Sequence, residues 1–86
     1  MKLFGIEFGK KNKPLTEEDF VKAAEACNFN NAKFIGTNAY RALLNFVGTP
    51  ENITKKFLKS IPDEDIEQIK GIKSAGHTII TYLKVN

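Results

Sequence analysis

The chain has 86 residues, 42% of them hydrophobic, so its length and composition fit one small domain with a single core. Thirteen Lys and Arg against ten Asp and Glu give a formal net charge of +3, which permits a nucleic-acid or acidic partner without requiring one. One cysteine and one histidine exclude an internal disulfide and a structural zinc site, and no apolar run is long enough to span a membrane.

Residues 1–15 are interpreted as an N-terminal arm followed by a basic linker. Phe4, Ile6 and Phe8 alternate along the chain, which is typical of a short β-strand or extended arm. These apolar side chains either cover the helical core or bind a partner, so they are the candidate partner-binding residues. The apolar stretch is short and contains Glu7, unlike a signal peptide, and we therefore expect a cytoplasmic protein.

Residues 16–86 are predicted to form one helical domain, and its first helix begins at Thr16. Thr16 can cap the helix, and Asp19 stands at the spacing of a capping box. Four residues recur at helical spacing and are expected to face the core: Phe20, Ala23, Ala24 and Cys27. The asparagine-rich stretch 28–31 is expected to end this helix.

The second helix is predicted from Thr37 or Asn38 to Val47, with Gly48 at its C-terminal end. Its apolar face contains Tyr40, Leu43, Leu44 and Val47. A third helix is predicted from Pro50 to about Ser60, because Thr49 can cap it and proline favours the first helical position.

A fourth helix is predicted after Pro62, with three acidic residues in its first turn at 63–65. Beyond Gly71, the apolar residues fit a helix over 74–84, and the β-branched residues of 78–85 would also suit a strand. The helix is favoured because the motif described below, which flanks this segment, requires one. The fold class is therefore mostly α: a compact bundle of four to five short helices with an N-terminal arm or short strand.

Two segments, 34–44 and 69–80, resemble each other. Each contains an apolar approach, a glycine, small polar residues and then an apolar helix. In this respect residues 32–83 resemble the tandem helix-hairpin-helix domains of excision-repair nucleases, Holliday-junction branch-migration proteins and NAD-dependent DNA ligases. The hairpins, expected near 34–38 and 70–74, are degenerate. Phe34 stands where the first would have its leading glycine, and Lys73 where the second would have its trailing glycine.

The resemblance implies a small, non-enzymatic DNA-binding domain that contacts backbone phosphates without sequence specificity. In such a hairpin a glycine lets the backbone approach a phosphate, and the following helix N-terminus offers free N–H groups. Carried onto this chain, the nucleic-acid-binding residues are Gly36, Thr37, Asn38 and Arg41 at the first hairpin and Lys70, Gly71, Lys73, Ser74 and His77 at the second.

Each of these residues also has a simpler interpretation. Gly36 and Gly71 can be ordinary turn or cap glycines, Lys70 and Lys73 solvated lysines, and His77 a histidine at the edge of the core. No catalytic constellation, cofactor motif or metal-ligand spacing occurs in the sequence, and we therefore do not expect an enzyme. The alternative function is a helical protein–protein adaptor or self-associating module, for which a phage or mobile-element origin is one option.

Overall fold

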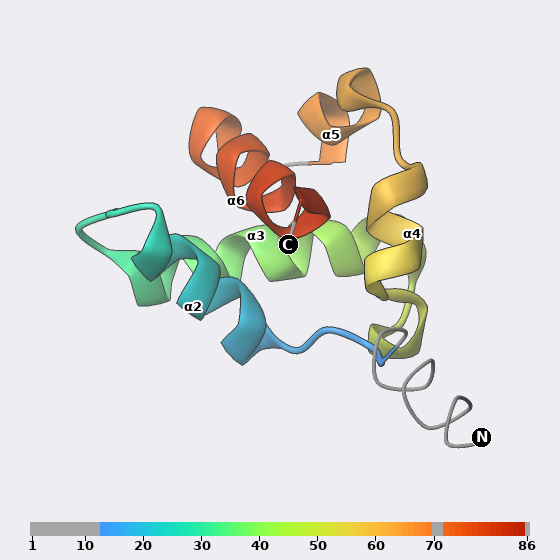
Figure 1. The fold of residues 1–86 in the computed structure, drawn as a ribbon, viewed down its shortest axis with the longest axis horizontal. Coiled ribbons are helices and arrows are strands. Elements are labelled where there is room, and N and C mark those ends of the chain that lie inside the picture. Colours follow the sequence, from blue (N-terminus) through green and yellow to red (C-terminus); the bar gives the residue numbers. More distant parts are fainter. Residues whose placement is uncertain (1–12, 70–71, 86) are drawn as a thin grey trace, which may run out of the picture.

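The computed structural model describes residues 13–69 and 72–85, and this part of the chain is almost entirely helical (Figure 1). It contains five α-helices and one short 3-10 helix: α2 Glu17–Ala26, α3 Ala32–Val47, η1 Pro50–Asn52, α4 Lys55–Ser60, α5 Asp63–Ile69 and α6 Lys73–Val85. An isolated β-bridge joins Pro14 to Thr54, and no strand is present within the described residues. The predicted fold class, a mostly α bundle of short helices, is confirmed.

The start of α2 is as predicted. The Thr16 hydroxyl accepts a hydrogen bond from the Asp19 backbone N–H at 3.3 Å, and the Thr16 N–H donates to the Asp19 carboxylate at 2.9 Å. This is a capping box, and it satisfies two backbone donors that the first turn of a helix leaves free. The helix ends at Cys27, followed by Asn28 in the left-handed conformation with φ 68°.

Helix α3 begins at Ala32, five residues before the predicted start, so the prediction of a hairpin near 34–38 is wrong. Gly36 lies buried inside the helix and faces α2. A Cβ atom added to Gly36 would lie 2.6 Å from Val21 Cα and 2.8 Å from the Phe20 carbonyl oxygen. The glycine is therefore explained by the close approach of two helix backbones and not by a turn.

The predicted helix from Pro50 to Ser60 is interrupted in the structure. Ile53 is extended and fully buried, and its carbonyl accepts a hydrogen bond from the Leu15 N–H. Thr54 then caps α4, because its hydroxyl accepts a hydrogen bond from the Phe57 N–H at 3.1 Å. Burial of Ile53 and a second capping threonine therefore divide this segment into η1 and α4.

The C-terminal helices follow the sequence prediction closely. Helix α5 begins at Asp63, directly after Pro62, and α6 covers Lys73–Val85, so the strand alternative for 78–85 is wrong. Lys70 and Gly71 of the second predicted hairpin lie outside the described residues. So does the predicted N-terminal arm with Phe4, Ile6 and Phe8.

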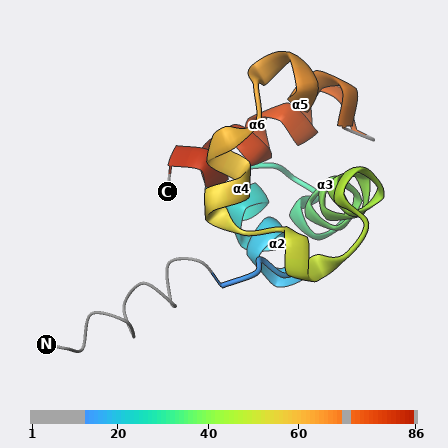
Figure 2. The same cartoon turned by 90° about the vertical axis from the view of Figure 1, so that its right-hand side faces the viewer.

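The core lies where α2, α3, α4 and α5 pack around α6. In Figure 2, α3 is seen nearly end-on, with α2 below it and α5 and α6 above it. Helix α6 packs against α2, α3, α4 and α5. Every α-helix contributes to the large, fully buried side chains, which are Phe20, Leu43, Ile53, Leu58, Ile66, Ile79 and Ile80. The shared core therefore fixes the positions of α2 and α3, whose polar side chains lie on the surface.

Candidate functional site

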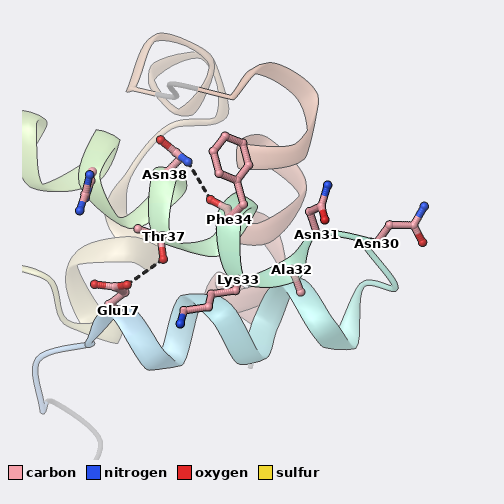
Figure 3. A pocket seen from close by; sticks show the side chains of 9 residues that line it. Glu17, Asn30, Asn31, Ala32, Lys33, Phe34, Thr37 and Asn38 are labelled. Atoms are coloured by element: carbon pink, nitrogen blue, oxygen red, sulfur yellow. Dashed lines mark hydrogen bonds between the residues drawn. The ribbon is translucent and has the colours of Figure 1, made fainter.

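An open pocket of about 660 Å³ lies between α2 and the N-terminal half of α3 (Figure 3). It is lined by Glu17, Asn30, Asn31, Ala32, Lys33, Phe34, Thr37, Asn38 and Arg41. Three of the residues predicted to bind nucleic acid are therefore brought together here, namely Thr37, Asn38 and Arg41. The fourth, Gly36, is buried against α2 and does not line the pocket.

The α3 wall of the pocket is one stripe of the helix surface. Phe34, Thr37, Asn38 and Arg41 are spaced i, i+3, i+4 and i+7, which places them on one side of an α-helix. They share this side because the helix is continuous through 34–41. A hairpin at these positions would have separated Phe34 from Arg41.

Two hydrogen bonds hold the polar side chains of this stripe (Figure 3). The Thr37 hydroxyl donates to the Glu17 carboxylate at 2.7 Å and so links α3 to the first residue of α2. The Asn38 amide donates to the Phe34 carbonyl oxygen, one helical turn back, at 2.8 Å. Asn38 keeps its side-chain oxygen free to accept a hydrogen bond.

The pocket combines an exposed aromatic ring with cations of two kinds. Phe34 is 65% exposed, which is unusual for so large an apolar side chain. Lys33 and Arg41 are exposed, and neither makes an ion pair within residues 13–69 and 72–85. On α2, by contrast, Lys22 lies 3.5 Å from the Glu18 carboxylate.

Burial and nearby carboxylates change the pKa of the Tyr40 hydroxyl. Tyr40 packs its ring against Phe20, with ring centroids 5.4 Å apart. Burial raises the pKa of the Tyr40 hydroxyl, and the negative charges of Glu17 and Glu51 raise it further. Tyr40 is therefore a neutral, packed residue at physiological pH and not an acid or base for the pocket.

Of the second group of predicted nucleic-acid-binding residues, the structure describes Lys73, Ser74 and His77, which lie on α6 and do not line the pocket. Lys73 is exposed at the first position of the helix, and the Ser74 carbonyl accepts a hydrogen bond from the Thr78 hydroxyl. His77 Nδ1 lies 3.2 Å from the Glu67 carboxylate of α5, without hydrogen-bond geometry. Among the predicted residues that the structure describes, Thr37, Asn38 and Arg41 line the pocket together.

Polar side chains join α5 to its neighbours at the other end of α6. Lys84 Nζ donates to the Ile61 carbonyl at 2.8 Å and to the Asp63 carboxylate at 3.0 Å. The hydrogen bond and the positive charge of Lys84 lower the pKa of the Asp63 carboxyl. These side chains therefore contact each other, and none of them lines the α2–α3 pocket.

Sequence reasoning did not select two exposed aromatic residues, Phe34 and Phe46. Phe46 is 52% exposed near the C-terminal end of α3, and its ring centroid lies 6.4 Å from that of Phe57. A helical wheel begun at Ala32 would have found Phe34, since at 100° per residue it falls opposite the buried Leu43. The predicted turn at 34–38 places Phe34 outside the helix, so the sequence prediction does not show that Phe34 lies on the face opposite Leu43.

Comparisons with known proteins assign no family to this fold. No protein-family model matches the chain. No curated protein and no solved structure is significantly similar to it. Within residues 13–69 and 72–85, no helix has the length and apolar character to cross a membrane. In the same ranges, no three or more His, Cys, Asp or Glu residues gather as metal ligands would.

Proposed function

We propose that this protein is a small helical adaptor that binds another protein through the α2–α3 pocket. The observation that carries the proposal is the exposure of Phe34 in a pocket whose other lining residues, apart from Ala32, are polar or charged. Aromatic residues are enriched at protein interfaces and dominate their binding energy, whereas an exposed phenylalanine adds nothing to folding. Phe46 gives α3 a second exposed aromatic residue near its other end.

The distribution of charge supports a protein partner over the DNA backbone. The described residues contain nine basic and nine acidic side chains, so their formal charges cancel. The net charge of +3 arises at sequence positions outside them, from Lys2, Lys10, Lys11 and Lys70 against Glu7. Sequence-independent DNA binding depends on neutralising phosphates with an excess of Lys and Arg.

Affinity capture from a lysate of the source organism, with and without nuclease, tests this proposal. Wild type, Phe34→Ser and Phe46→Ser are immobilised at equal amounts, and retained proteins are quantified. We expect proteins that are retained by wild type, are unaffected by nuclease and are lost with Phe34→Ser. Retention that disappears with nuclease, or that is equal for wild type and Phe34→Ser, would contradict the proposal.

DNA binding through the start of α6 is the second candidate function. Lys73 and Ser74 lie in the first turn of α6, which contains no acidic residue, and Lys70 and Gly71 precede them in the sequence. A helix N-terminus flanked by lysines is favourable for a phosphate. This candidate function uses only the second of the two hairpins by which the sequence resembles helix-hairpin-helix domains, near residues 70–74. It does not require Gly36 to contact DNA.

Fluorescence anisotropy with labelled duplex, junction and single-stranded oligonucleotides tests the second candidate over a salt series. DNA binding should weaken steeply with salt, and Lys73→Glu should weaken it more than Lys59→Glu, which makes the same charge change on α4. Absence of binding at low salt would exclude this function. Equal effects of the two variants would exclude the start of α6 as the contact.

A further inference from the structure

We infer that the α2–α3 pocket binds an extended peptide segment, about four residues long, that carries an acidic side chain close to a large apolar one. This inference rests on the proposed adaptor function and specifies the chemistry of the partner. Four observations support it. They are the length of the pocket, the position of Phe34, two cations without an ion pair among the described residues (Lys33 and Arg41), and the side-chain amides of the asparagines that line the pocket.

The length of the pocket suits a short extended segment. Its lining residues on α3 extend from Ala32 to Arg41, and nine steps of 1.5 Å along a helix axis give about 14 Å. An extended chain advances about 3.3 Å per residue, so roughly four residues cover this distance. A partner helix would advance little more than two turns over the same length and would present few side chains to the pocket.

Phe34 supplies the apolar contact. Its ring stands at the side of α3 away from Glu17 and Lys33, as the close-up shows (Figure 3). Being 65% exposed, it has much of its surface available to a partner side chain. A large apolar side chain that packs against it leaves water, which favours binding. We therefore expect Leu, Ile, Met or an aromatic residue at one position of the segment.

The charged residues of the pocket favour an acidic ligand. Lys33 and Arg41 make no ion pair among the described residues, whereas the Glu17 carboxylate already accepts the Thr37 hydroxyl. Lys33 and Arg41 carry two positive charges against the one negative charge of Glu17, so the pocket has a positive excess that a carboxylate complements. Arg41 can hold a carboxylate through two parallel hydrogen bonds, which sets the direction of the bound segment.

The asparagine side chains suit a peptide backbone. Asn30 and Asn31 line one end of the pocket and make no side-chain hydrogen bond in the described structure, and Asn38 retains its free oxygen. An amide offers both donors and acceptors, and therefore matches the alternating N–H and C=O groups of an extended segment. These contacts do not depend on the sequence of the ligand, which leaves selectivity to Phe34, Lys33 and Arg41.

Selection from a random nonapeptide display library against the full-length chain tests this inference. The probes for measurement are fluorescein-labelled synthetic copies of the most enriched peptides, titrated by anisotropy. We expect these peptides to carry Asp or Glu within about four residues of a large apolar residue. Phe34→Ser and Arg41→Glu should each weaken binding at least tenfold. Glu17→Gln should strengthen it, because a negative charge that faces the acidic ligand is removed.

The controls separate failure of the pocket from failure of the adaptor function. Phe46→Ser makes the same chemical change on another part of α3 and should retain binding. Peptides lost with Phe46→Ser but kept with Phe34→Ser would overturn the pocket and leave the adaptor function standing. Enrichment of basic peptides would overturn the charge argument and with it the inference. A library without any enriched peptide would overturn the inference but not the adaptor function, which the affinity capture tests separately.

Discussion

The helix pairs α2–α3 and α5–α6 differ in the groups that make their contacts, which are backbone atoms in the first pair and polar side chains in the second. Between α2 and α3 the backbones approach closely at Gly36, so the contact needs little from the polar side chains above it. At α5–α6 the polar side chains themselves make the connection, through Lys84 with Asp63 and through His77 beside Glu67. The first pair therefore leaves Lys33 and Arg41 in a pocket without an ion pair among the described residues, whereas in the second pair charged side chains contact each other.

This difference indicates which side chains of a small domain are available to bind a partner. A residue engaged in holding two helices together is not free to bind a partner without a loss of stability. Close backbone packing at a glycine releases the neighbouring side chains from that task. The α2–α3 surface should therefore tolerate substitutions that change binding, whereas substitutions at α5–α6 should change stability.

The largest effect is expected at Gly36. In Gly36→Ala the added Cβ would meet backbone atoms of Val21 and Phe20 at under 3 Å, so the helices must move apart. Overpacking of this kind costs about 3 kcal/mol, and the better helix propensity of alanine offsets about 1. Urea unfolding should show a net loss of about 2 kcal/mol. A gain in stability would mean that the helices are not closely packed at this point.

A control for Gly36→Ala is available at Gly48. There φ is +97° and a Cβ would meet no atom within 4 Å. Gly48→Ala should therefore cost about 1 kcal/mol, through backbone conformation alone. The two glycines distinguish a packing requirement from a turn requirement.

A smaller effect is expected when Lys84 is replaced. Lys84→Met keeps most of the aliphatic stem but removes the hydrogen bonds to the Ile61 carbonyl and the Asp63 carboxylate. The expected loss is about 1 kcal/mol, the usual net value of a hydrogen bond. Chemical denaturation measures it, with Lys59→Met on the exposed side of α4 as the control. A loss no greater than that of the control would show that α5 is not held by this residue.

Thr37→Val is expected to have a still smaller effect on stability. The variant removes the hydrogen bond to Glu17, which is exposed, and should cost about 0.5 kcal/mol. The Glu17 carboxylate then loses its donor and its charge is less neutralised, so acidic peptides should bind more weakly. Urea unfolding and peptide anisotropy measure the two effects. Unchanged binding would show that Glu17 does not face the ligand.

The pH dependence of Asp63 is expected to be the smallest effect. Its pKa is lowered in the folded protein, chiefly by the hydrogen bond from Lys84. The stabilisation is therefore fully present above the unfolded carboxyl value of about 3.9 and is lost as pH falls through the folded pKa. Asp63→Asn should lower the melting temperature slightly at pH 7 and leave it unchanged at pH 2. An equal decrease at both pH values would contradict this assignment.

The sequence predicts most of the fold because its local signals are strong. Thr16 and Asp19 form the expected capping box, Gly48 ends α3, and Pro62 precedes α5. The interruption at Ile53 was not predicted, because it depends on burial of that side chain against residues distant in sequence. Local propensity cannot report such a contact.

The site was only partly predictable. Thr37, Asn38 and Arg41 were selected for a phosphate-binding hairpin and instead share one face of a continuous helix. A buried glycine that allows two helices to approach and a turn glycine look alike in sequence. Only the position of Val21 across the interface distinguishes them. Because the predicted turn at Gly36 is wrong, the exposure of Phe34 was also not predicted: that exposure depends on the helix beginning before residue 34.

The most direct test is to measure stability and peptide binding on the same variant, Phe34→Ser. Phe34 is 65% exposed, so the free energy of unfolding should stay within about 0.5 kcal/mol of wild type, as for most surface substitutions. Binding of the enriched acidic–apolar peptide should fall at least tenfold. A clear loss of stability together with unchanged peptide binding would contradict the account, because Phe34 would then be a packing residue and the pocket would have no role in binding.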